Sequence, residues 1–106
     1  MELNATISAS DPSEILVEKL DGGYVKALLV AYSSFKDDPL IPEQKKEIEN
    51  YQIEFRQRGD RYFVLFLAER KPSERELLGG ESELGKDVMY AVSKNDFKVV
   101  DRKFYK

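Results

Sequence analysis

The chain has 106 residues, of which 42% are hydrophobic and 35% charged, and its formal net charge is −3. This size and composition are typical of one globular domain, and without a basic excess the chain lacks the positive patch that nucleic-acid binding usually requires. Cysteine and histidine are absent, which excludes thiol nucleophiles, disulfides, Cys or His metal sites and imidazole catalysis. We therefore expect one domain over residues 1–106, with no nucleic-acid partner, no metal and no cofactor.

Residues 1–10 are polar and rich in small side chains, and we expect them to form a flexible segment. They contain no apolar core of a signal peptide, and no stretch of the chain approaches the ~18 apolar residues of a membrane span. Two cellular compartments fit this sequence. The chain suits a periplasmic or secreted protein if a signal peptide has been removed, and a cytoplasmic protein otherwise.

Two helices are predicted in the first third of the chain. Asp11-Pro12-Ser13 is a good helix start, so residues 13–20 (SEILVEKL) are expected to form a short helix. Asp21 is expected to cap the next helix, because its carboxylate can accept the free N–H groups of a first turn. In YVKALLVAYSSF (24–35), apolar side chains recur at spacings of three and four and mark one buried face. That face comprises Tyr24, Leu28, Ala31 and Phe35, widened by Val25, Leu29 and Tyr32.

After this helix the sequence favours strands. Residues 36–39 (KDDP) end the helix, and EQKKEIE (43–49) adds a helical turn. Residues 51–56 then alternate between apolar and polar side chains, which indicates a strand with one buried face. RYFVLFLAER (61–70) is apolar on both faces, so we expect this strand to be central in a sheet with cover on both sides.

A tight turn joins these two strands at Arg58-Gly59-Asp60, a tripeptide also known as an integrin-adhesion signal. Gly59 can supply the positive φ of a tight hairpin, and Gly-Asp fits a two-residue type II′ loop. A three-residue loop is also compatible with the sequence. The two-residue register places Arg58 opposite Arg61 and matches the apolar faces, in the pairs Phe55–Val64, Ile53–Phe66 and Tyr51–Ala68. We prefer the turn to the adhesion signal.

The rest of the chain predicts a long connector and a second hairpin. KPSERELLGGESELGK (71–86) is the connector. DVMYAVS and FKVVDRKFY then pair around a KND turn, with Val92 opposite Val99 and Ala91 opposite Val100. The order helix, strand, strand, connector, strand, strand is typical of an α+β fold in which a helix packs on a curved four-stranded antiparallel sheet.

This order resembles the cystatin-like fold, which includes the nuclear-transport-factor-2-like domains and small bacterial domains such as immunity-like proteins. The matching stretches lie in residues 22–106 and are YVKALLVAYSSF, ENYQIEF, YFVLF, LLGG and VMYAVSKNDFKVV. The protease-binding motifs of cystatins are missing, because the first hairpin lacks Gln-x-Val-x-Gly and the chain has no Trp. The resemblance implies a fold that hosts many unrelated functions.

The first functional hypothesis is a non-enzymatic protein-binding or structural module. One helix covers one face of the sheet, so the apolar side chains on the other face need cover. Residues 1–20, another protein or a second copy of the chain in a homodimer could supply it. The candidate interaction residues are Phe63, Leu65, Leu67, Arg58 and Asp60.

The alternative hypothesis is a small-ligand-binding cone of the nuclear-transport-factor-2-like type. The resemblance implies a His-Asp or Tyr-Asp pair in such a cone. Histidine is absent here, so the expected form is a Tyr/carboxylate site, for which Tyr32, Tyr51, Tyr62 and Tyr90 are available. Six tyrosines and six phenylalanines could line a pocket or fill a core. The pocket candidates are Tyr24, Tyr32, Phe35, Tyr51 and Phe66. No catalytic residue is assigned, and the acids Asp37 and Asp38 are interpreted as solvated loop residues.

Overall fold

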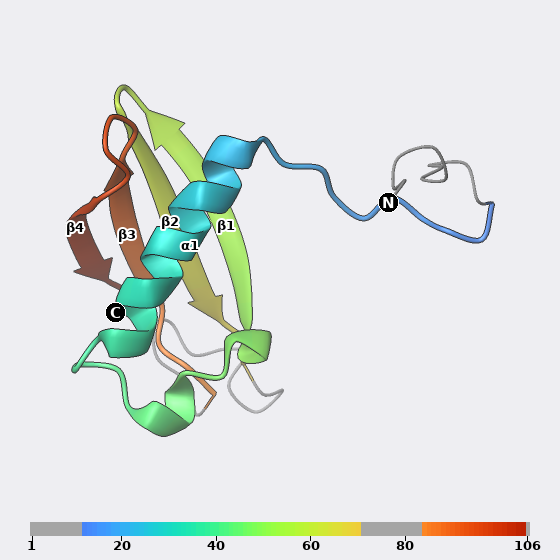
Figure 1. Ribbon diagram of the computed structural model, residues 1–106. Coiled ribbons are helices and arrows are strands. Elements are labelled where there is room, and N and C mark those ends of the chain that lie inside the picture. Colours follow the sequence, from blue (N-terminus) through green and yellow to red (C-terminus); the bar gives the residue numbers. More distant parts are fainter. Residues whose placement is uncertain (1–11, 71–83, 106) are drawn as a thin grey trace, which may run out of the picture.

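The computed structural model describes residues 12–70 and 84–105 (Figure 1). One helix lies across one face of a four-stranded antiparallel sheet of order β1-β2-β3-β4. The elements are α1 (Gly22–Asp37), η2 (Glu43–Lys45), η3 (Ile48–Asn50), β1 (Tyr51–Arg58), β2 (Arg61–Ala68), β3 (Val88–Ser93) and β4 (Val99–Phe104). The predicted α+β class and the order of helix and strands are confirmed. The segment 1–10 and most of the connector 71–86 lie outside the described residues.

α1 forms where the sequence predicts it, but its buried face is narrower than expected. Ala27, Ala31 and Phe35 are fully buried at a spacing of four residues, which places them on one side of the helix. Val25 and Leu29, which were expected to widen that face, are 42% and 63% exposed. None of the described helices is long and apolar enough to cross a membrane.

The segment before α1 is where the structure departs most from the prediction. Residues 13–20 form no helix, and the whole of 12–20 is exposed and leads away from the sheet (Figure 1). A helix this short gains little stability without a packing partner. Asp21 occupies the N-cap position, but its carboxylate makes no capping hydrogen bond. Its backbone carbonyl instead accepts the N–H of Tyr24 at 3.0 Å.

The first hairpin has the predicted register. Arg58 pairs with Arg61 and Phe55 with Val64, and the remaining predicted pairs follow. Gly59 has a φ of 61°, and Asp60 is not among the described residues with positive φ. A positive φ at only the first of two loop residues is the pattern of a type II′ turn. The two-residue turn is therefore confirmed.

The second hairpin differs from the prediction by one residue. Val92 pairs with Val99 as expected, but Ala91 pairs with Asp101 instead of Val100, because a bulge lies between Ala91 and Val92. Val100 consequently has no partner at this point and is 47% exposed.

Aromatic rings fill the space between α1 and the sheet. Phe35 stacks on Phe66 with ring centroids 4.6 Å apart. Tyr51 meets Phe35 edge-on at 5.0 Å, and Tyr90 meets Phe66 edge-on at 5.7 Å. Edge contacts and offset stacks are the arrangements that aromatic pairs prefer. These four rings are thus part of a packed core.

Candidate functional site

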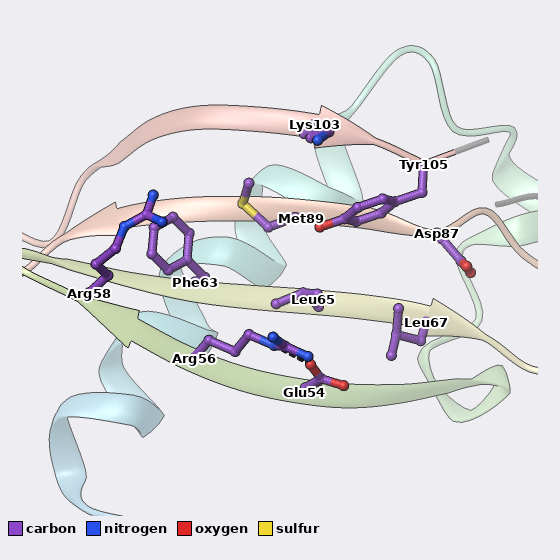
Figure 2. A pocket seen from close by; sticks show the side chains of 10 residues that line it. All are labelled: Glu54, Arg56, Arg58, Phe63, Leu65, Leu67, Asp87, Met89, Lys103 and Tyr105. Carbon is purple, nitrogen blue, oxygen red and sulfur yellow. Dashed lines mark hydrogen bonds and ion pairs between the residues drawn. The ribbon is translucent and has the colours of Figure 1, made fainter. Parts of the chain in front are cut away.

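β2 presents apolar side chains to both faces of the sheet. Val64 and Phe66 are fully buried in the core under α1. Phe63, Leu65 and Leu67 point to the opposite face (Figure 2), because successive side chains of a strand alternate. β2 lies between β1 and β3 as predicted. α1 packs on the face that carries Val64 and Phe66, and no described helix lies over the second face (Figure 1).

A shallow trough of about 670 Å³ runs over this outer face. Its floor is apolar and consists of Phe63, Leu65 and Leu67 from β2 and Met89 from β3 (Figure 2). We call this surface the β2 trough. Its rim is formed by Glu54, Arg56, Arg58, Asp87, Lys103 and Tyr105.

The long side chains of the rim shield part of the floor. Arg56 forms an ion pair with Glu54 along β1 (Figure 2). The Arg58 guanidinium lies over the Phe63 ring, 5.4 Å from its centroid. Such side chains cover apolar surface with their stems while the charged ends stay in water. Leu65 lies between its strand partners Glu54 and Met89 and is 8% exposed.

Two cations of the rim are available to a partner. The Lys103 ammonium lies 5.5 Å from the centroid of the Tyr105 ring, and Arg58 contacts Phe63. Within the described part of the chain, neither Arg58 nor Lys103 forms an ion pair with a carboxylate. The β2 trough therefore combines an apolar floor with unneutralised positive charge at its rim.

Asp87 closes one end of the β2 trough. Its Oδ1 accepts the backbone N–H of Ala68 at 2.7 Å, and its Oδ2 lies 3.7 Å from a guanidinium nitrogen of Arg70. Burial raises the pKa of the Asp87 carboxyl above its ordinary value, against the opposing effects of the Ala68 N–H and of Arg70. This side chain connects the end of β2 to the start of β3.

The predicted interaction residues do not all lie together. Arg58, Phe63, Leu65 and Leu67 belong to the β2 trough. Asp60 is exposed at the hairpin turn and is not part of the trough lining. Its backbone carbonyl accepts the N–H of Lys94 at 2.8 Å, which ties the first hairpin to the second.

The predicted ligand-pocket residues lie on the other face, within the helix–sheet layer. Phe35, Tyr51 and Phe66 contact one another directly. Tyr32 stacks beside Phe35 at 6.2 Å, whereas Tyr24 packs near the start of α1, 5.0 Å from Tyr62. The structure thus brings four of the five candidates into one ring cluster, and Tyr24 packs apart from it.

Sequence reasoning missed a buried polar cluster at the end of α1. Asp38 was interpreted as a solvated acid, but it is 3% exposed. Its Oδ2 accepts hydrogen bonds from the Tyr90 hydroxyl at 2.8 Å and from Arg102 at 2.9 Å. Its Oδ1 accepts the backbone N–H of Leu40 at 3.0 Å. The local signal was an acid directly after the helix, but its partners on β3 and β4 are remote in the sequence.

The cluster of Asp38, Tyr90 and Arg102 holds the end of α1 against β3 and β4. Burial raises the pKa of the Tyr90 hydroxyl well above its ordinary value, and the neighbouring Asp38 carboxylate adds to the effect. This shift favours the protonated hydroxyl, which is the form that donates the hydrogen bond to Asp38. An open groove of about 360 Å³ adjoins the cluster, bordered by Ser33 and Ser34 of α1. Across the described residues, no group of three acidic side chains is placed to hold a metal ion.

No protein-family model, no curated protein and no solved structure matches this chain. The likeness to cystatin-like and nuclear-transport-factor-2-like domains thus stays an expectation from the sequence, and the function has to be argued from the chain itself.

Proposed function

We propose that this chain is a non-enzymatic protein-binding module and that the β2 trough is its binding surface. The observation that carries the proposal is the apolar row Phe63, Leu65 and Leu67 on the sheet face that α1 leaves uncovered. An antiparallel sheet with one solvated face usually alternates apolar and polar side chains. β2 does not follow this pattern, and a contiguous apolar surface with a polar rim is typical of an interaction site.

The chemistry of the trough defines the kind of partner that fits. The apolar floor accepts aliphatic or aromatic side chains, which gain free energy when water leaves both surfaces. Arg58 and Lys103 favour acidic residues beside those side chains, because opposite charges at a rim guide association and fix orientation. We therefore expect a polypeptide segment with apolar residues between acidic ones.

The packing of the core supports this proposal over the alternative of a ligand-binding cone. Phe35 and Phe66 are fully buried and stacked at 4.6 Å, and Tyr51 fills the space beside them. A ligand at this position would have to displace side chains that already contact one another. The outer face requires no such rearrangement.

Selection from a displayed peptide library tests the proposed function. Peptides enriched on the wild-type chain should carry apolar residues flanked by Asp or Glu, and Leu67→Lys should abolish their binding. The matched control is Leu29→Lys, the same substitution at a 63% exposed site on α1, which should bind as the wild type does. Thermal melts show whether both variants are folded. Peptides that bind the Leu67→Lys variant unchanged would contradict the proposal.

A further inference from the structure

A second unpartnered apolar feature precedes α1. Ile15, Leu16 and Val17 are 85%, 74% and 90% exposed, so three consecutive aliphatic side chains lie almost entirely in water. Ile and Val favour extended backbone, and this stretch forms no helix. Glu14 and Glu18 lie on either side of the trio. Residues 14–18, which we call the EILVE segment, thus have the composition that the β2 trough favours.

We propose that the EILVE segment of one copy of this chain binds in the β2 trough of a second copy, which returns the same contact. This inference rests on the proposed function, because it names the partner of that same surface. The chain then supplies both halves of one interface. Ile15, Leu16 and Val17 are exposed, and no described helix lies over the β2 trough.

The two halves match in charge and in length. Glu14 and Glu18 are negative, and the rim contributes Arg58 and Lys103, which have no carboxylate partner within the described residues. Glu14 and Glu18 are four residues apart, about 13 Å in an extended chain, and the row from Phe63 to Leu67 spans the same four steps of β2. In an extended segment Ile15 and Val17 share one face and Leu16 points the other way, so Ile15 and Val17 fit within the length of the apolar floor.

The direction of the segment before α1 favours binding to the trough of a second copy over binding to the trough of the same molecule. Asp21 has extended backbone angles, φ −67° and ψ 148°. From this residue the segment leads away from the sheet (Figure 1). A reciprocal exchange uses one EILVE segment and one trough from each copy, so it closes as a two-fold dimer and leaves neither surface open.

Molar mass in solution tests the exchange, with the full chain of 12.2 kDa at several concentrations. The wild type and the Leu29→Lys control should have the mass of two chains. Val17→Lys in the segment and Leu67→Lys in the trough should each have the mass of one chain. An equimolar mixture of these two variants should recover dimers, because one intact segment can still meet one intact trough.

Three outcomes would overturn the inference. They are a wild type that is monomeric at every concentration, a dimer that survives Val17→Lys, and two monomeric variants that do not associate when mixed.

A synthetic peptide of residues 12–21 separates this inference from the proposed function. It should bind the Val17→Lys chain, whose trough is intact and open, and should not bind Leu67→Lys. If this peptide fails to bind while selected library peptides still bind the trough, the second copy is the wrong partner and the proposed function survives. If neither kind of peptide binds, the proposed function fails as well.

Discussion

The hydroxyl of Tyr90 on β3 donates a 2.8 Å hydrogen bond to Oδ2 of Asp38, the residue that follows the last turn of α1. Both residues are buried, with exposures of 1% and 3%. Arg102 of β4 donates to the same oxygen at 2.9 Å. Burying a carboxylate is costly unless hydrogen bonds and an opposite charge compensate it. This carboxylate therefore fixes the end of the helix against two strands.

Removal of the Tyr90 hydroxyl should weaken this anchor. Tyr90→Phe keeps the buried ring but leaves Oδ2 of Asp38 with Arg102 as its remaining donor. We expect the free energy of unfolding to fall by about 1.5–3 kcal/mol, the usual contribution of a hydrogen bond to a charged group. Urea denaturation measures it. Asp37→Asn, at the exposed neighbouring acid, should change stability by less than about 0.5 kcal/mol. A Tyr90→Phe variant as stable as the wild type would contradict the anchor.

The same contact predicts a signature at alkaline pH. The pKa of Tyr90 is raised above its ordinary value of 10.0, first by burial and then by Asp38. Above pH 10 the hydroxyl ionises in the unfolded chain but stays protonated in the folded one, so stability falls as the pH rises. Tyr90→Phe lacks this group and should lose stability less steeply above pH 10. Parallel curves for both proteins, measured by thermal melts, would show that the pKa of Tyr90 is the same in the two states.

Asp87 predicts a pH effect in the acidic range. Burial raises its pKa in the folded chain, so its contribution to stability is greatest below its ordinary pKa of 3.8 and is lost as the pH rises. Asp87→Asn cannot ionise, and its amide oxygen can still accept the Ala68 N–H. We expect this variant to gain stability relative to the wild type between pH 3 and pH 7, as measured by melting temperature. A relative loss over that range would mean that the attraction of Arg70 outweighs burial.

Local patterns in the sequence predicted α1, both hairpins and the apolar outer row of β2. These features depend on the spacing of side chains and on one turn glycine, Gly59. Where burial depends on remote neighbours, the prediction was wrong. The aliphatic side chains Ile15, Leu16 and Val17 are exposed in place of the expected helix, and Leu29 faces solvent. Asp38 is buried by partners 52 and 64 residues away, which no local pattern indicates.

A side chain larger than hydrogen at Gly85 is predicted to destabilise the fold, because Tyr51 packs against this residue. A Cβ atom at Gly85 would lie 2.5 Å from the Tyr51 ring and 2.8 Å from Cβ of Ala68. The ring is held in place, since its hydroxyl donates to the Lys45 carbonyl at 2.7 Å and accepts the Lys86 N–H at 2.8 Å. Gly85→Ala should therefore lower the free energy of unfolding by about 1–3 kcal/mol, as overpacking usually does.

Gly22 is the matched control for that substitution. A Cβ atom at Gly22 would have no heavy atom within 4 Å. Gly22→Ala should leave stability unchanged or raise it by about 0.4–1 kcal/mol, because alanine restricts the unfolded chain. Urea denaturation of both variants gives the comparison. Equal effects at the two glycines would contradict the packing of Gly85 against Tyr51.

The turn at Gly59 predicts that stability depends on the glycine and that cell adhesion does not depend on the neighbouring Asp60. Gly59 has a φ of 61°, a conformation that β-branched residues rarely adopt. Gly59→Val should therefore lower the free energy of unfolding by about 1–3 kcal/mol. Unchanged stability would contradict a turn that requires positive φ at this position.

Asp60→Glu should leave stability unchanged, because the side chain is exposed and the hydrogen bond from Lys94 is accepted by the backbone carbonyl. If Arg58-Gly59-Asp60 serves as a turn, surfaces coated with wild type and with Asp60→Glu should retain cells equally poorly. Attachment to the wild type that disappears with Asp60→Glu would establish the tripeptide as a ligand.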